Sequence, residues 1–448
     1  MTGVFFGDKA LVNLRGDLLS AAPREAAAIL LAGRAETGNG TRLLVREYFQ
    51  VPSEAYQTQE RLRAVIDPSF IMPLLKRARN EALSLVLTHT HPFAKEANFS
   101  PVDDEGERVL MPSLFSRTRN CPHGALVLTA TDCSARIWTN PSDEPKHLSR
   151  VVEVGRDLSI HDGQQRDVVI PTQFDRSVRA FGREGQARLA ALSIGIVGLG
   201  GMGSVVAEQL AYLGVKELLL LDPDTIEETN LNRILGATRQ NIGDEKVSAA
   251  ADMIRRINPH VEATAIRGDV TISDDARHLL YCDFVFCCTD SHGSRAVLNQ
   301  IAYQYMIPMI DLGVRVQVKK GTVESITGRV QMLAPGLPCL VCHSLLDPEE
   351  VRRDLLSDEA RARDRYIVGA AEPQPAVISL NGTVASLGVT MMLSAVTGMS
   401  VAARHQLVLF NRGVVRAAAS EPTPNCVICS IHGVLARGDT WPMAGRPR

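Results

Sequence analysis

A strand, a glycine-rich turn and a helix follow one another directly between residues 192 and 214. The run LSIGIVGLG has the apolar pattern of a buried parallel strand, and SVVAEQLAYLG reads as a helix. The next apolar run, KELLLLD, reads as a second strand. This order predicts an α/β domain built on a parallel sheet.

The turn contains Gly198, Gly200 and Gly203 at G-x-G-x-x-G spacing, with Gly201 between them. A bare backbone at a helix N-terminus can receive phosphate groups. Asp222 closes the next strand, where its carboxylate can accept a hydrogen bond from a ribose hydroxyl. NAD, FAD and ATP enzymes share this pattern, so the turn alone does not separate these nucleotides.

Charged and amide side chains downstream do separate them. Asn230, Arg233 and Lys246 follow the second strand, and Asp290 follows another buried strand. A dehydrogenase needs a hydride-accepting pocket and has no use for several cations beside the phosphates. An enzyme that attacks the α-phosphate of ATP needs those cations, and it needs an acid for magnesium. We therefore expect ATP and Mg²⁺.

These residues resemble the E1-like adenylyltransferases of the MoeB, ThiF and HesA type. The shared order is Gly-x-Gly-Gly-x-Gly-Ser, Asp-x-Asp, Asn-Leu-x-Arg, Gly-x-x-Lys and Cys-Thr-Asp, from about Phe174 to Cys429. The resemblance implies a Rossmann-like domain that adenylates a carboxylate. The residues that it assigns to the nucleotide and its magnesium ion are Asp222 at the ribose, Asn230, Arg233 and Lys246 at the phosphates, and Asp290 at the metal.

The same resemblance gives Arg176 a role. Homodimers of this kind insert an arginine at this position into the nucleotide site of the partner subunit. The alternative is a solvated charge on a helix. A homodimer is therefore implied by the resemblance and not by spacing.

Four of the nine cysteines form two C-x-x-C pairs, which are Cys339 with Cys342 and Cys426 with Cys429. Two such pairs suit a structural, tetrahedral Zn²⁺ ion, with redox chemistry as the alternative. Family members that form a thioester carry a cysteine in the crossover loop between the pairs, and this sequence has none there. We therefore expect adenylation alone, with transfer to a separate thiol protein or sulfur donor.

The chain has 448 residues, which is too long for one ordinary core. Periodicity is lost between residues 140 and 172, where turn formers are frequent. We predict a first domain over residues 1–145, a linker over 146–172 and a second domain over 173–448.

Composition and charge exclude some classes of partner. A net charge of -2 gives no case for nucleic acid or an anionic membrane. No signal-peptide pattern opens the chain, so the cytoplasm is the expected compartment. Glycine, serine and threonine dilute the apolar stretch over 384–403, which favours a buried helix over a membrane span.

The first domain contains LVLTHTHPF, an apolar run that ends on His89 and His91. Side chains at i and i+2 of an extended segment project from one face, so both imidazoles can reach one ion. Asp103 lies twelve residues beyond His91, after a loop that can return its carboxylate. These ligands leave a fourth zinc position open, as in catalytic sites. Glu25, on a predicted apolar helix, is the candidate general base.

With Ser100 added, these residues resemble the JAMM signature of JAB/MPN metallopeptidases over roughly residues 1–145. That resemblance implies an α/β JAB/MPN domain with a catalytic zinc ion. The roles that it assigns are zinc ligand for His89, His91 and Asp103, general acid/base for Glu25, and oxyanion stabilisation for Ser100. The His-to-Asp gap is one residue longer than in the commonest form. The alternative is an ordinary strand end and a surface glutamate.

Together the resemblances predict a fusion of two enzymes that both act on the C-terminal end of one protein substrate. The adenylating domain would activate the C-terminal glycine of a ubiquitin-like protein in a bacterial conjugation pathway, and the peptidase would process or deconjugate that protein. An E2-like thiol protein is a further expected partner. The alternatives are sulfur-carrier activation for thiamin, molybdopterin or cysteine synthesis, adenylation of a short peptide, and a nucleotide-binding scaffold without catalysis.

Overall fold

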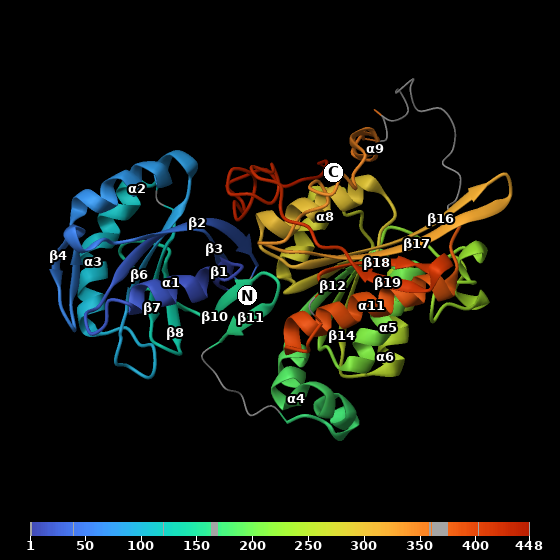
Figure 1. The fold of residues 1–448 in the computed structure, drawn as a ribbon, viewed down its shortest axis with the longest axis horizontal. Helices are drawn as coiled ribbons and strands as arrows, with labels where there is room; N and C mark the ends of the chain where they lie inside the picture. The colour runs from blue at the N-terminus through green and yellow to red at the C-terminus, as the bar shows by residue number, and fades with distance from the viewer. Residues whose placement is uncertain are drawn as a thin grey trace. The chain divides into compact units, whose positions relative to one another are not determined.

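The computed structural model describes residues 2–447 except 39, 120, 163–168, 358–359, 361–374 and 402. The chain divides into two compact units. The first consists of Met1–Asp167, Gln304–Met306 and Ile431–Pro442, and the second of Val168–Tyr303, Ile307–Ser430 and Met443–Arg448. Figure 1 traces both units along the chain.

The first unit is built on a mixed sheet of nine strands in the order β11-β10-β1-β3-β2-β6-β7-β8-β9. Its strands are β1 (Gly3–Gly7), β2 (Ala27–Thr37), β3 (Gly40–Gln50), β6 (Ser84–Thr90), β7 (His123–Leu128), β8 (Cys133–Trp138), β9 (Lys146–Leu148), β10 (Arg150–Val154) and β11 (Leu158–His161). A small hairpin, β4 (Tyr56–Gln59) and β5 (Ala64–Ile66), stands apart from this sheet.

Helices cover both faces of this sheet. The helix α1 (Ala10–Leu19) packs on one face with Ala28 and Leu30 of β2. The helices α2 (Pro68–Glu81) and α3 (Pro101–Arg117) pack on the other face with Ile29 and Leu31. Successive residues of a strand point to opposite faces, so β2 is buried on both sides.

The predicted helix around Glu25 is wrong. The run AAILLAG forms the start of β2, and Glu25 lies two residues before that strand. A central strand that is covered on both faces reads as a continuous apolar run, and periodicity cannot distinguish such a run from a buried helix.

The predicted linker over 146–172 differs from the structure. Residues 146–161 contain β9, β10 and β11, and β10 pairs in parallel with β1 from Gly3 to Gly7. These strands are short and their partners lie at the far end of the chain, so local periodicity does not reveal them. The helix α4 (Asp175–Ala190) then opens the second unit.

A C-terminal segment also belongs to the first unit, whereas the sequence placed residues 173–448 in one domain. Arg46 on β3 donates hydrogen bonds to the backbone carbonyls of Ile431 and Leu435. The backbone N–H of Glu36 donates to the Asp439 carboxylate at 2.7 Å. Irregular backbone held by side chains leaves no periodic signal in the sequence.

The second unit is built on a sheet of eight strands in the order β14-β13-β12-β15-β16-β17-β18-β19. Pairing is parallel from β14 to β16 and antiparallel from β16 to β19. The strands are β12 (Ser193–Val197), β13 (Glu217–Leu221), β14 (Glu262–Ile266), β15 (Phe284–Cys287), β16 (Met309–Lys319), β17 (Thr322–Leu333), β18 (His405–Leu409) and β19 (Val414–Ala417). The parallel half with its crossover helices is the predicted α/β domain.

Helices lie on both sides of this second sheet in Figure 1. The helices α5 (Gly201–Leu213), α6 (Lys246–Ile257) and α11 (Ile378–Thr397) lie on one side, and α8 (His292–Gln304) lies on the other. Two shorter helices are α7 (Ser273–Ala276) and α9 (Pro348–Asp354).

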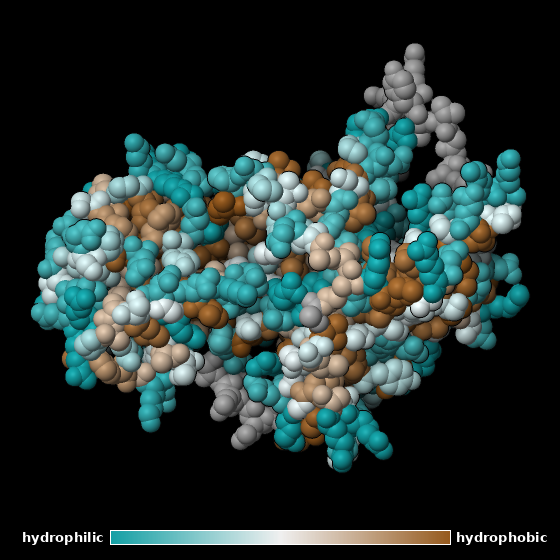
Figure 2. Space-filling model, in the orientation of Figure 1, coloured by the Kyte–Doolittle hydropathy of each residue, from teal (hydrophilic) through white to brown (hydrophobic). Residues whose placement is uncertain are grey.

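The helix α11 corresponds to the apolar stretch predicted over 384–403, although it starts and ends earlier. By length and composition it is one helix that could cross a membrane, and half of that stretch is buried inside the protein. It packs against α5 and the sheet, as a core helix does. Figure 2 shows apolar side chains in the region of β18, β19 and α11, where Val414 and Val415 of β19 are exposed.

Candidate functional site

The glycine turn lies between β12 and α5, as predicted, and close backbone contacts require glycine at two of its positions. Gly198 has a φ of 89°, and a Cβ there would lie 2.8 Å from the carbonyl oxygen of Cys288. A Cβ on Gly203 would lie 1.8 Å from the carbonyl oxygen of Gly198. The helix α5 has no side-chain cap, so the N–H groups of its first turn remain available to an anion.

Asp222 reaches back to this turn from the end of β13. Its carboxylate accepts hydrogen bonds from the backbone N–H of Leu199 at 2.6 Å and of Asp224 at 2.9 Å. Burial raises the pKa of the Asp222 carboxyl, against the opposing effect of Lys246. The acid is therefore fixed beside the glycine turn, where the sequence placed a ribose contact.

The predicted cations Lys246 and Arg233 are both held by short polar contacts. Lys246 begins α6, and its Nζ lies 2.7 Å from the Asp224 carboxylate. Arg233 Nη1 donates to the carbonyl oxygen of Thr229 at 2.7 Å, and its side chain passes close to Gly201. Arg233 thus lies beside the turn, and Lys246 acts on Asp222, whose carboxylate bonds to the turn.

Asn230 and Asp290 have different surroundings. Asn230 is buried, and its Oδ1 accepts the backbone N–H of Glu227 at 3.2 Å, so in the free chain it shapes the loop. Asp290 follows β15, which neighbours β12, and it is exposed. Carboxylate oxygens are ligands that Mg²⁺ prefers, so Asp290 fits the predicted metal position.

Arg176 is exposed on the first turn of α4. Asp224 was not assigned a role from sequence, although it is the second acid of the Asp-x-Asp pattern. Its ion pair with Lys246 is visible only once β13 and α6 are brought together.

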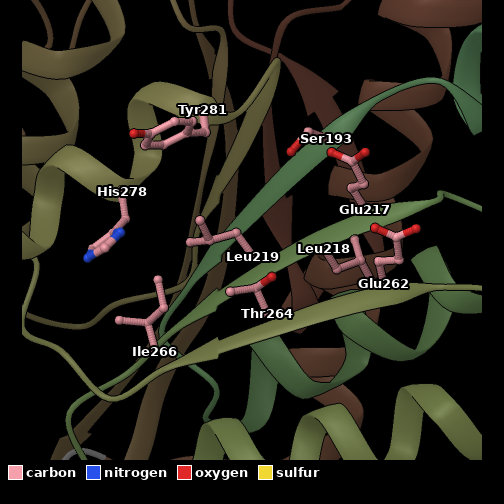
Figure 3. Close-up of a pocket in the computed structure, with 9 residues that line it drawn as sticks. All are labelled: Ser193, Glu217, Leu218, Leu219, Glu262, Thr264, Ile266, His278 and Tyr281. Carbon is pink, nitrogen blue, oxygen red and sulfur yellow. The ribbon is translucent and has the colours of Figure 1, made fainter. Parts of the chain in front are cut away.

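A separate cavity of about 270 Å³ lies against β13 and β14. Figure 3 shows Glu217 and Glu262, the first residues of β13 and β14, at one end and His278 and Tyr281 at the other. The lining of the cavity extends along β14 from Glu262, its first residue, to Ile266, its last, and it includes no residue of the glycine turn. It is therefore separate from the glycine turn.

The two C-x-x-C pairs come together in the second unit. The sulfur atoms of Cys339 and Cys426 lie 3.6 Å apart, and those of Cys342 and Cys429 lie 3.4 Å apart. Tetrahedral zinc with bonds of about 2.3 Å separates its sulfurs by about 3.8 Å. The cluster therefore fits a structural zinc ion.

Changing Cys426 to serine should lower the zinc content of the full chain from about two ions to about one. It should also lower the melting temperature of the second unit, since structural zinc binding is coupled to folding. Metal analysis and thermal unfolding would measure both effects. Cys121→Ser, at a buried cysteine outside the cluster, is the control. An unchanged zinc content in Cys426→Ser would show that the cluster has another use.

The second cluster lies at one end of the first sheet. His89 is in β6, His91 follows it, and Asp103 is in the first turn of α3. The Nε2 atoms of the two histidines are 3.1 Å apart, and they lie 3.0 Å and 3.5 Å from the carboxylate oxygens of Asp103. Ligand atoms on a tetrahedral zinc ion with bonds of about 2.1 Å lie about 3.4 Å apart. The three side chains therefore fit one ion, as the sequence predicted.

Glu25 faces this cluster because of strand register. Ala27 of β2 pairs with His89 of β6, and the backbone N–H of Thr90 donates to the carbonyl of Ala26. Extending this antiparallel register brings Glu25 opposite His91, with 3.9 Å between Oε1 and Nε2. Burial raises the pKa of Glu25, and the two histidines only partly offset this effect.

Ser100 has a contact that the sequence did not reveal. It is the N-cap of α3, and its backbone N–H and hydroxyl donate to the Asp103 carboxylate at 2.6 Å and 2.8 Å. Burial acts to raise the pKa of Asp103, but hydrogen bonds from His89 and His91 outweigh it and hold that pKa well below its usual range. In the free chain Ser100 therefore supports a predicted ligand.

Arg136 on β8 contacts the helix and the aromatic ring that lie next to the histidine and aspartate cluster. Its guanidinium donates to Asp104 and Glu107 of α3, at 2.6 Å and 3.0 Å, and lies 3.8 Å from the centroid of the Phe99 ring. That ring stands edge-on to His89, with centroids 6.5 Å apart. Arg136 thus fixes the helix that carries Asp103 and the ring beside His89.

Changing Arg136 to alanine should weaken metal binding by the first unit by about tenfold to a hundredfold, as loss of a supporting contact does. Competition with a chromophoric chelator would measure the affinity. Arg108→Ala is the matched control, because Arg108 pairs with Glu144 on the exposed side of α3. Equal metal affinity in Arg136→Ala and the wild type would contradict this supporting role.

Comparison with known proteins assigns the second unit to a family. A family model, the ThiF family, matches residues 174–427, which is more than half of the chain. The chain belongs to the ThiF family. This confirms the part of the sequence interpretation that began near Phe174.

Curated relatives agree with the family. Molybdopterin-synthase adenylyltransferase of Salmonella typhimurium is 35% identical over 178 residues, covering 39% of this chain and 68% of that protein. SAMP-activating enzyme E1 of Haloferax volcanii is 30% identical over 176 residues, covering 38% and 62%. Ubiquitin-like modifier-activating enzyme 5 of Arabidopsis thaliana is 30% identical over 190 residues, covering 37% and 42%. The chain thus spans less than two thirds of the last two relatives.

The chain is also similar to a solved structure. The crystal structure of E. coli MccB with ATP is 18% identical and covers 58% of this chain and 75% of that one, with a TM-score of 0.47.

Proposed function

We propose that the second unit adenylates the C-terminal glycine of a ubiquitin-like protein, and that the first unit is a zinc metallopeptidase acting on the same protein. The observation that carries the first part is the convergence of Asp222, Arg233 and Lys246 on the glycine turn of a ThiF-family domain. The second part rests on the three-ligand cluster with Glu25 beside it.

In the adenylation step, a carboxylate oxygen of the substrate attacks the α-phosphorus of ATP. The bond from that phosphorus to the bridging oxygen of the β-phosphate breaks, and pyrophosphate leaves. Arg233 and Lys246 stabilise the negative charge on the phosphates, and the N-terminus of α5 supplies backbone donors. Asp222 positions the nucleoside, and a magnesium ion at Asp290 would neutralise further phosphate charge.

In the peptidase step, Glu25 takes a proton from the attacking water and delivers it to the nitrogen of the leaving amine. His89, His91 and Asp103 would hold a zinc ion, which supplies polarisation of the scissile carbonyl and activation of the water. Stabilisation of the oxyanion by Ser100 remains part of the proposal, and it requires the hydroxyl to leave Asp103.

The fate of the activated carboxylate defines two candidate pathways. We favour a bacterial ubiquitin-like conjugation pathway with an E2-like thiol protein. In such a pathway a peptidase and an activating enzyme both act on the C-terminal end of the same ubiquitin-like protein. Sulfur-carrier activation is the second candidate, and the name of the Salmonella typhimurium relative favours it. No cysteine separates Cys342 from Cys426, so either acceptor would be a separate molecule.

The proposal includes assembly and compartment. Two copies would pair through the ThiF-family unit, with Arg176 of α4 reaching the nucleotide site of the other copy. The exposed position of this arginine supports that role. The cytoplasm, where ATP and reduced thiols are supplied, is the proposed compartment.

Pyrophosphate release tests the adenylation proposal. The full chain would be mixed with ATP, magnesium and a ubiquitin-like protein that ends in glycine. We expect release that depends on both proteins, and no release above background when the partner lacks its terminal glycine. Equal pyrophosphate release with and without the terminal glycine of the partner would contradict this substrate class. Adding either sulfide or an E2-like protein would then show which acceptor takes the activated carboxylate.

A further inference from the structure

Two helices of the second unit begin at the same corner of the fold. Gln209 of α5 donates to Ser386 of α11 at 2.7 Å, and Asn381, in the first turns of α11, lies against Gly201 at the start of α5. Asn381 precedes Ser386 as Gly201 precedes Gln209, so the helices run in the same direction. The positive ends of both helix dipoles therefore meet beside the glycine turn.

The Asn381 side chain points into this corner. It is 6% exposed, and its carboxamide has no hydrogen-bond partner among the residues that the structure describes. Its Nδ2 lies 2.4 Å from the point that a Cβ on Gly201 would occupy, and Arg233 carbon atoms lie 3.4 Å from the same point. The residue is largely withdrawn from water, and its free amide donors suit a ligand that accepts hydrogen bonds.

The surroundings define the chemistry of that ligand. The first turn of α5, the Arg233 side chain and the Asn381 amide all offer donors and positive potential. Gly201 has no side chain, and the bare backbone lets the amide approach the turn. An anion with several acceptor oxygens satisfies these donors together, and in an ATP-dependent enzyme that anion is the triphosphate.

We propose that the NH₂ group of Asn381 binds a phosphate oxygen of ATP, beside Arg233 and the N-terminus of α5. The inference rests on the proposed adenylation and adds a nucleotide-contacting residue to it. The glycine turn and Asn381 lie far apart in the sequence, and only the packing of α11 along α5 joins them.

Calorimetric titration of the full chain with ATP and with adenosine tests this role. Changing Asn381 to alanine should weaken ATP binding by about tenfold or more, since a hydrogen bond to a charged oxygen contributes that much. Asn381→Asp keeps the shape but adds a charge that repels phosphate, so it should weaken ATP binding further. Adenosine has no phosphate, and its affinity should stay the same in both variants.

Thr383→Asp is the matched control, because it adds the same charge near the start of α11 at an exposed position. It should bind ATP like the wild type. Wild-type ATP affinity in Asn381→Asp would overturn the inference, and so would an equal loss of adenosine binding, which indicates a purely structural role. A wild-type chain that binds no ATP would overturn the proposed adenylation itself.

Discussion

Changing Glu25 to glutamine should abolish cleavage of a ubiquitin-like fusion protein while leaving zinc bound to His89, His91 and Asp103. Glutamine keeps the shape of the side chain but cannot take a proton from water. General acid–base catalysis contributes about a hundredfold to ten-thousandfold to such reactions, so cleavage should fall by that factor. The measurement is the cleavage rate together with the metal content of the same preparation.

Two further variants show whether this result is specific to the general base. His89→Ala should lose both the metal and the cleavage, because it removes a ligand from the cluster. Arg108→Ala, on the exposed side of α3, should lose neither. Cleavage at the wild-type rate by Glu25→Gln would contradict the peptidase assignment. The extra residue between His91 and Asp103 would then indicate a domain that has lost its activity.

Changing Arg233 to alanine should slow ATP–pyrophosphate exchange by roughly a hundredfold or more. Each group that stabilises charge developing in the transition state contributes about 2 to 4 kcal/mol, and about 1.4 kcal/mol corresponds to a factor of ten in rate. Asp290→Ala should have a comparable effect, because the same phosphates need their magnesium ion. Exchange assays with saturating ubiquitin-like partner would measure both variants.

The matched control for this series is Arg239→Ala. Arg239 is an exposed arginine of the same loop region that pairs with Glu228, and it should not alter exchange. Wild-type exchange in Asp290→Ala would remove the adenylation assignment. Fusion cleavage should persist in every variant of this series, since the peptidase residues belong to the first unit.

Some features of the fold and site were predictable because their signals are local. Gly198, Gly200 and Gly203 lie within one turn, and the strand and helix on either side have clear apolar patterns. The spacing of His89 and His91 on a strand fixes their common direction. The two C-x-x-C pairs are recognisable one by one, although only the structure brings Cys339 beside Cys426.

Other features depend on partners distant in sequence. Glu25 was assigned to a helix because β2 is buried on both faces, and its place opposite His91 follows from the pairing of β2 with β6. The strands within 146–161 are defined by their pairing with β1 and β8, and the segment Ile431–Pro442 by contacts such as those of Arg46. The position of Asn381 beside Gly201 depends on the packing of α11 against α5. None of these relations has a local pattern in the sequence.

The mass of the ubiquitin-like partner after reaction with ATP and the full chain tests the central claim most directly. The account predicts an intact partner that carries one adenylyl group on its C-terminal glycine, with pyrophosphate as the other product. A partner that stays unmodified, or one that carries a phosphoryl group while ADP forms, would contradict adenylation at the glycine turn.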